Sequence, residues 1–182
     1  MKIEYIHGSR YGNGATVARE FERQMACQGV EVGVHHVREV KPKELAPADL
    51  YVFSSPGRMG RPIGSMRRFL KGLALPAGTR YAILATGMAP QPDEKTGRMP
   101  TDEELGKCER VVPIMHDALE SKGLVEVAQD KIFVTGLKGP LEEGWEQKVH
   151  VFAARIAQAV ERGVGADAHT DVSSLVGNDA RR

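Results

Sequence analysis

The sequence predicts a three-layer α/β domain, in which a five-stranded parallel sheet is doubly wound with helices on both faces. Segments typical of strands alternate with segments typical of helices along most of the 182 residues. The runs at 50–54 (LYVFS) and 81–86 (YAILAT) are almost continuously apolar, as in strands that helices cover on both faces. A turn rich in glycine follows the first apolar run, as it does in many ligand-binding α/β domains.

The N-terminal half supplies three of the expected strands. Residues 3–7 (IEYIH) predict the first strand, and residues 30–37 alternate between apolar and polar, which indicates a second strand near an edge. Between them, residues 15–28 carry an apolar stripe at helical spacing, and Gly29 ends this helix. The stripe consists of Val17, Ala18, Phe21 and Met25. The third strand is the run at 50–54.

The C-terminal half continues the alternation. An apolar stripe within residues 63–73 predicts a helix, and residues 81–86 predict the fourth strand. A helix over 108–122 ends at Gly123, and residues 132–135 (IFVT) predict the fifth strand. A last helix carries the stripe Val149, Phe152, Ile156 and Val160. The domain therefore spans 1–163, and 164–182 is expected to be a polar, flexible C-terminal tail.

Composition excludes several classes of partner. The formal net charge of +1 gives no electrostatic basis for binding nucleic acid, and no apolar run is long enough to span a membrane. The first residues are too polar for a secretory signal peptide. Neither Cys27 nor Cys108 has a second cysteine at metal-site spacing, and the six histidines show no metal pattern either. We therefore expect free thiols, no metal and a cytoplasmic location.

The first glycine-rich turn, residues 8–18 (GSRYGNGATVA), has the composition of a phosphate loop. A nucleoside-triphosphate loop is excluded, because Asn13 and Gly14 occupy the places of its second glycine and its lysine. A dinucleotide fingerprint is a poor match, because Val17 stands in the place of its third glycine. Two interpretations stay open: a mononucleotide phosphate held at a helix N-terminus, and a turn without a ligand.

This turn resembles the first loop of the flavodoxin family, which follows the pattern [ST]-x-[ST]-G-x-[ST]. The matching residues are Ser9, Gly12 and Asn13. Tyr11 and Gly14 depart from the pattern, because the family keeps hydroxyl groups there. Thr16 lies two residues farther on and is a replacement for the missing hydroxyl.

The second loop, residues 55–70 (SPGRMGRPIGSMRRFL), follows the third strand. It resembles its counterpart in the flavodoxin-like NAD(P)H:quinone oxidoreductases named after tryptophan-repressor binding. The residues in register with that pattern are Ser55, Pro56, Arg58, Gly60, Gly64, Met66, Arg67, Phe69 and Leu70. Gly57 and Met59 depart from it. An aromatic side chain often stacks on the flavin at the place of Met59, so Met59 is either a ring contact or ordinary packing.

The resemblance covers about residues 1–163 and implies a flavodoxin-like fold with strand order 2-1-3-4-5. It also implies that FMN is the cofactor, with its ring along the second loop and beside the start of the third loop. The expected cofactor-binding residues are Ser9, Arg10, Tyr11, Gly12, Asn13, Gly14, Thr16, Pro56, Gly57, Arg58, Met59, Gly60, Thr86 and Gly87. The long connection at 87–105 is a lid, a partner surface or a flap.

Three functions follow from the resemblance. The first is electron transfer through FMN with a redox protein partner or a small quinone-type acceptor. The second is an NAD(P)H-dependent quinone or flavin oxidoreductase, which would make the chain an enzyme. The third is a flavin-free domain for protein interaction. The oligomeric state stays open, and no residue is assigned a catalytic role.

Three other residues attract attention because of their chemistry. His7 ends the first strand beside the phosphate loop, and we expect a structural histidine with its hydrogen bonds satisfied. Cys108 is expected to open a helix, a position that lowers a thiol pKa, although no catalytic partner is near it in the sequence. Trp145 lies on the last helix and is expected to pack there.

Overall fold

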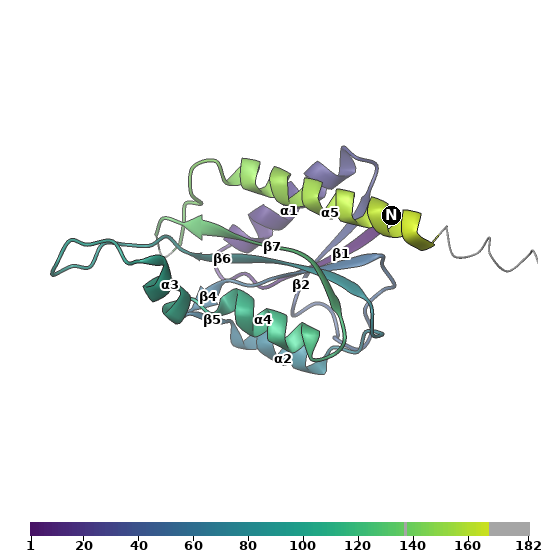
Figure 1. Ribbon diagram of the computed structural model, residues 1–182, viewed down its shortest axis with the longest axis horizontal. Coiled ribbons are helices and arrows are strands. Elements are labelled where there is room, and N and C mark those ends of the chain that lie inside the picture. Colours follow the sequence, from purple (N-terminus) through teal and green to yellow (C-terminus); the bar gives the residue numbers. More distant parts are fainter. Residues whose placement is uncertain (137, 168–182) are drawn as a thin grey trace, which may run out of the picture.

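The computed structural model describes residues 1–136 and 138–167, and Figure 1 shows their arrangement. A parallel five-stranded sheet lies at the centre, with the strand order β2-β1-β3-β6-β7. The strands are β1 (Lys2–His7), β2 (Glu31–His36), β3 (Leu50–Ser54), β6 (Arg80–Met88) and β7 (Val125–Val134). Numbered by their place in the chain, these strands have the order 2-1-3-4-5. The predicted fold class and strand order are confirmed.

Helices cover both faces of this sheet (Figure 1). The helices α1 (Asn13–Ala26) and α5 (Trp145–Asp167) lie on one face, and α2 (Gly64–Gly72) and α4 (Val111–Glu120) lie on the other. A short additional helix, α3 (Asp102–Cys108), precedes α4. The sheet is therefore the middle of three layers, as the alternating sequence pattern predicts.

Each face of the sheet has its own apolar core. On the α1 and α5 side, the ring of Phe21 lies 5.3 Å from the ring of Tyr5 and 5.9 Å from that of Phe152, measured between centroids. On the other side, Phe53, Phe69 and Met115 belong to the second cluster. Side chains of this size each stabilise the fold by about 1.5–3 kcal/mol when fully buried. The two cores hold the carboxyl ends of the strands in fixed relative positions.

Three element boundaries differ from the sequence prediction by about three residues or more, and the others by one or two. The edge strand β7 begins at Val125 rather than at residue 132, because its first half is only partly buried and lacks a continuous apolar run. Cys108 ends α3 instead of opening a helix, so its thiol does not lie at a helix N-terminus. The helix α5 continues past residue 163 to Asp167, and the rest of the expected tail, 168–182, lies outside the described residues.

The second loop contains a small hairpin that the sequence did not indicate. Its strands β4 (Gly57–Arg58) and β5 (Arg61–Pro62) pair antiparallel, and Met59 and Gly60 form the turn with φ of 52° and 71°. Two consecutive residues with positive φ are typical of tight two-residue hairpin turns. Because each strand has only two residues, no alternating pattern marks them in the sequence.

The direction of winding brings three loops together at the carboxyl edge of the sheet. β1 pairs with both β2 and β3, and β3 pairs with β6, so the loops that follow β1, β3 and β6 leave the sheet side by side. Open α/β sheets bind ligands at such a point, where the strand order reverses. Among the described residues, no helix has the length and apolar character needed to cross a membrane.

Candidate functional site

A pocket of about 670 Å³ lies at this edge of the sheet. Predicted site residues from all three loops line it. They are Ser9, Arg10, Tyr11, Asn13, Gly14, Pro56, Gly57, Arg58, Thr86 and Gly87. The two glycine-bearing turns and the end of β6 therefore surround one space rather than opening on separate faces.

The first loop presents the bare N-terminus of α1 to this pocket. Gly12 is the N-cap residue, with φ of 92°, and no side chain caps the helix. The first turn also contains no acidic residue. Its backbone N–H groups have no acceptor within the helix, and the helix dipole places partial positive charge there. This arrangement favours an anion, above all a phosphate.

Short contacts fix the shape of the first loop. The hydroxyl oxygen of Ser9 accepts a hydrogen bond from the N–H of Gly12 at 3.0 Å, which leaves its proton free to donate. A Cβ atom at Gly14 would lie 3.0 Å from the carbonyl oxygen of Gly8 and 3.3 Å from Cβ of Ser9. The side-chain amide of Asn13 donates to the carbonyl of Lys138 at 3.2 Å. The loop is thus tied to the segment after β7.

Hydrogen bonds of Ser55 hold the second loop in place. Its hydroxyl accepts from the N–H of Ile63 at 3.2 Å and donates to the carbonyl of Pro56 at 3.1 Å. The backbone N–H of Thr86 donates to the carbonyl of Ser55 at 3.1 Å. These bonds close the loop on itself and attach it to β6, so that Gly57 and Arg58 stand opposite the first loop.

The end of β6 passes close to a pair of opposite charges. Lys131 and Glu109 form an ion pair, and burial lowers the pKa of Lys131. A Cβ atom at Gly87 would lie 2.9 Å from Cε of Lys131 and 3.1 Å from a carboxylate oxygen of Glu109. A side chain at residue 87 would come too close to this ion pair, so glycine leaves room for it where β6 forms the wall of the pocket.

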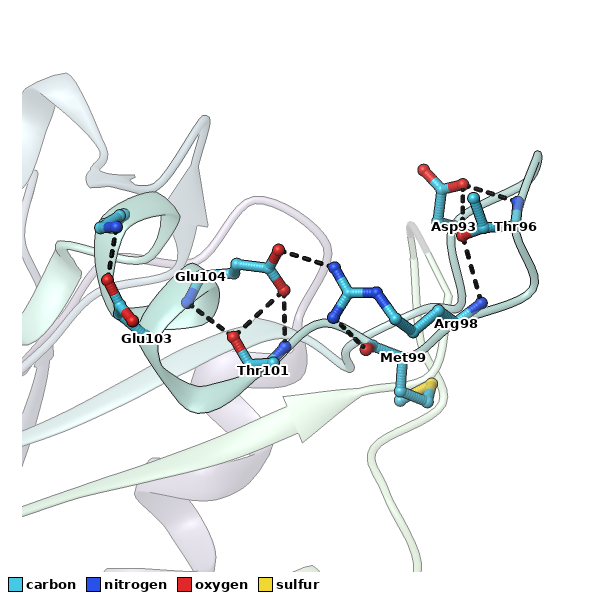
Figure 2. Close-up of polar contacts among 8 residues, drawn as sticks. Asp93, Thr96, Arg98, Met99, Thr101, Glu103 and Glu104 are labelled. Carbon is cyan, nitrogen blue, oxygen red and sulfur yellow. Dashed lines mark hydrogen bonds and ion pairs between the residues drawn. The ribbon is translucent and has the colours of Figure 1, made fainter.

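The third loop continues as an exposed arm, residues 89–101, that projects from the body of the molecule (Figure 1). Figure 2 shows its internal contacts: Asp93 accepts from the N–H of Thr96 at 2.8 Å, and Arg98 pairs with Glu104 at 2.7 Å. Thr101 and Glu104 form a capping box at the start of α3. The ion pair and the box lower the pKa of Glu104 to about 2. These contacts give the arm a defined conformation.

Four predicted site residues do not line the pocket: Gly12, Thr16, Met59 and Gly60. The hydroxyl of Thr16 donates to the carbonyl of Gly12 at 3.3 Å and so lies along its own helix. Met59 is 94% exposed at the tip of the hairpin. The carbonyl of Gly60 accepts from the N–H of Arg110 at 2.7 Å, which connects the hairpin to the start of α4.

Several pocket residues were not predicted from the sequence. They are His36, Arg38, Ile63, Gly64, Ser65, Arg68, Met88, Val134 and Gly136. His36 ends β2 and Val134 ends β7, so the rule that ligands lie at the carboxyl ends of strands indicates both. Arg68 lies in the middle of α2, within the run 55–70 assigned to the second loop, but at a position that the oxidoreductase pattern does not specify.

A second cavity, of about 580 Å³, lies beside the first loop and includes His7, Gly12, Arg19, His36 and Glu39 in its lining. The side chain of His7 is buried, and its Nδ1 has no hydrogen-bond partner among the described residues, contrary to the sequence expectation. The rings of His7 and His36 meet edge to face at 5.3 Å. Burial, and then the charge of His36, lower the pKa of His7.

Other chemistry-bearing residues do not form a further site. Among the described residues, no group of three or more histidine, cysteine, aspartate and glutamate side chains is placed to hold a metal ion. Cys27 and Cys108 are both exposed free thiols. Trp145 packs against the core on the α5 side, as predicted.

Comparison with solved structures identifies the fold. Flavodoxin 2 from Bacillus cereus matches 87% of this chain and 99% of its own, with 22% identity and a TM-score of 0.66. A short-chain flavodoxin associated with a non-canonical PDU bacterial microcompartment has 16% identity and a TM-score of 0.65, over 88% and 99% of the two chains. The chain has the flavodoxin-like fold.

The same fold occurs as part of a larger protein. Rubredoxin oxygen:oxidoreductase from the anaerobe Desulfovibrio gigas matches 90% of this chain with 12% identity and a TM-score of 0.63. The present chain spans only 37% of the length of that protein. No protein-family model and no curated protein matches this flavodoxin-like chain.

Proposed function

We propose that the pocket binds FMN and that the chain is a flavoprotein that transfers electrons. One observation carries the proposal: the uncapped N-terminus of α1 opens into the same pocket as the second loop. A phosphate monoester carries about −1.5 to −2 charge at neutral pH, and bare helix N–H groups stabilise such an anion. The flavodoxin-like fold supports the proposal.

We assign the two ends of the cofactor to different loops of the protein. We assign the phosphate to the first-turn amides of α1 and to the free hydroxyl proton of Ser9. We assign the isoalloxazine ring to the space between Gly57 and Arg58 of the second loop and Gly87 at the end of β6. FMN supplies the redox chemistry when it is bound, while the protein binds and orients it.

Tyr11 is the better candidate for an aromatic contact with the ring. It lines the pocket, whereas Met59, at the corresponding place in the second loop, stands outside it. The phenol ring is 44% exposed and has the guanidinium carbon of Arg10 5.5 Å from its centroid. An exposed aromatic ring at a pocket mouth offers the flat apolar surface on which another ring stacks.

The proposal is tested by comparing two ligands that differ only in the phosphate. The purified protein is stripped of any bound small molecule and titrated with FMN and with riboflavin, with quenching of flavin fluorescence as the signal. We expect FMN to bind much more tightly than riboflavin. Equal affinities would show that α1 does not hold the phosphate, and no binding of either would favour a flavin-free interaction domain.

A second candidate function is that of an NAD(P)H-dependent quinone or flavin oxidoreductase. The residues of the second loop that match those enzymes favour it, and Pro56, Arg58 and Gly64 of that set line the pocket. Stopped-flow absorbance of the FMN-loaded protein distinguishes the two functions. Rapid NADPH oxidation that requires a quinone indicates the enzyme, whereas reduction only through another redox protein indicates an electron carrier.

A further inference from the structure

Four arginines line the pocket and have no acidic partner within residues 1–136 and 138–167. They are Arg10, Arg38, Arg58 and Arg68, and they come from the first loop, the turn after β2, the hairpin and α2. All four are exposed, and none takes part in an ion pair among the described residues. No aspartate or glutamate within residues 1–136 and 138–167 lines this pocket.

This charge exceeds what the proposed cofactor can balance. Arginine stays protonated at any physiological pH, so four guanidinium groups bring four positive charges to one opening. An FMN phosphate contributes about −2 at most, and the N-terminus of α1 already offsets part of that charge. About two positive charges therefore stay uncompensated at the mouth of the pocket, and their attraction extends outward over a Debye length of about 8–10 Å.

Apolar side chains stand exposed beside these arginines. Tyr11 and Met88 line the pocket and are 44% and 48% exposed, and Met59 is 94% exposed. Met59 lies between Arg58 and Arg61 at the hairpin tip, in a left-handed conformation with φ of 52°. The tight hairpin turn imposes this conformation, which is uncommon for a non-glycine residue and holds the Met59 side chain at the exposed tip.

The position of Met59 favours a protein over a small molecule. Met59 does not line the pocket, so a small ligand within the pocket would leave it in water. The face of a protein would cover the pocket mouth and the hairpin tip together. Stable protein interfaces combine apolar and aromatic contacts, methionine among them, with arginine and a polar rim.

We propose that this surface docks a redox protein whose own docking face is rich in carboxylates. We define the docking surface by Arg10, Arg38, Arg58, Arg68 and Met59. The inference rests on the proposed function, because the partner is the one that exchanges electrons with the bound flavin. Complementary charge would steer the partner and raise the association rate at low ionic strength, while Met59 provides the apolar contact.

Poly-L-glutamate serves as the probe for a carboxylate-rich face. Its binding to the FMN-saturated protein is measured by calorimetry at about 20 mM and about 200 mM salt, because screening shortens the reach of exposed charges over this range. The test variant is Arg38→Gln with Arg68→Gln, two residues to which we assign no cofactor contact. We expect about tenfold weaker binding at low salt, and weak binding of both proteins at high salt.

The matched control removes two positive charges elsewhere. Arg80 is the first residue of β6, at the opposite edge of the sheet, and Lys43 follows Pro42, which packs near the end of α2. Neither has an ion pair among the described residues, and Arg80→Gln with Lys43→Gln changes the net charge by the same amount. We expect this control to bind poly-L-glutamate as the wild type does.

A third variant, Met59→Glu, adds a carboxylate at the hairpin tip and should also weaken binding. Equal loss in the test and control variants, or no binding by the wild type, would overturn the proposal. Binding of inorganic pyrophosphate with the same arginine dependence, without binding of poly-L-glutamate, would replace the protein partner by a small phosphorylated ligand. The FMN titration is done first on each sample, so failure of the cofactor proposal is recorded separately.

Discussion

Ser9 and Thr16 are hydroxyl residues at the same helix start, but only Ser9 lines the pocket. Ser9 accepts from the N–H of Gly12, so its proton is available to an anion. Thr16 instead uses its proton on the carbonyl of Gly12. The direction of each hydroxyl, rather than its presence in the loop, decides which residue can bind the phosphate.

This difference between Ser9 and Thr16 predicts unequal effects of removing each hydroxyl on FMN binding. A hydrogen bond from a hydroxyl to a charged phosphate is worth about 1.5–3 kcal/mol, so Ser9→Ala should weaken FMN binding by about 10- to 150-fold. Thr16→Ala should leave the FMN affinity unchanged. The dissociation constants come from fluorescence titration. A larger loss with Thr16→Ala than with Ser9→Ala would place the phosphate elsewhere.

The buried ring of His7 makes stability depend on pH. The folded state holds the pKa of His7 below its ordinary value, chiefly through burial and then through the charge of His36. The unfolded chain therefore binds more protons as the pH falls from above about 6.5 toward the folded pKa, and the fold loses stability in that window. Each unit of pKa lowering corresponds to about 1.4 kcal/mol.

Thermal unfolding at pH 7.5 and pH 5.5 measures this loss. His7→Leu should lose less stability between the two pH values than the wild type, because the group that resists protonation is gone. His150→Leu is the control, since His150 lies on the exposed side of α5. Parallel pH profiles for wild type and His7→Leu would show that His7 is not the responsible group.

At the scale of the elements, α3 anchors the C-terminal part of the arm. Arg98 in the arm pairs with Glu104 of α3, and the same carboxylate accepts from the N–H of Thr101 at 2.8 Å. One side chain therefore holds the helix start and the arm together, as Figure 2 shows. Within the part of the chain that the structure describes, the neighbouring Glu103 pairs only with Lys107, one turn farther along α3.

This difference predicts unequal effects of two similar substitutions. Glu104→Ala should free the arm and speed its cleavage by trypsin after Arg98, because both the ion pair and the capping box are lost. Glu103→Ala removes a carboxylate from the same turn and should leave the cleavage rate near that of the wild type. Mass spectrometry of the fragments over time gives both rates, and equal rates would contradict the proposed anchoring.

At the scale of the whole molecule, Gly60 joins the hairpin to the end of α3 and the start of α4. Its carbonyl accepts from the N–H of Arg110, and a Cβ atom there would lie 1.7 Å from the carbonyl oxygen of Cys108. Gly78 also has a positive φ, of 82°, but a Cβ atom there would meet nothing within 4 Å. Substitution of Gly78 by alanine therefore introduces backbone strain alone, whereas substitution of Gly60 introduces the same strain and a steric clash.

We expect Gly78→Ala to cost about 1 kcal/mol of stability, which is the usual strain of a left-handed residue. Gly60→Ala should cost about 3 kcal/mol or more, because the backbone must move as well. Denaturant unfolding measures both changes in free energy. Similar values for the two variants would show that the hairpin is free to move away from α3 and α4.

Most elements of the fold could be predicted from local sequence patterns. The elements that were not predicted depend on tertiary contacts. The buried strand at 50–54 was predicted to the residue, because helices cover both of its faces and leave only apolar positions. The first half of β7 is an edge with mixed burial, and its sequence shows no such run. The hairpin at 57–62 is fixed by its contact with Arg110, which no local pattern records.

The residues of the candidate site also fall into those that the sequence predicted and those that it did not. Glycine and hydroxyl patterns located the two loops, whose pocket-lining residues include Ser9, Gly14 and Gly57. Arg38 reaches the pocket from the turn after β2, and the winding of the chain brings it there. Arg68 reaches it from α2, at a position that the loop pattern does not mark. The outward position of Met59 depends on a turn geometry that the letters M-G do not specify.

The bond between Gly60 and Arg110 has a consequence for protein engineering. The hairpin, α3 and the arm form one mechanical unit, because each is attached to the next through the backbone or through the contact at Gly60. Grafting a hairpin from another flavodoxin-like protein would therefore misplace the arm as well. A transplant that keeps its shape must carry residues 55–110 as a single block.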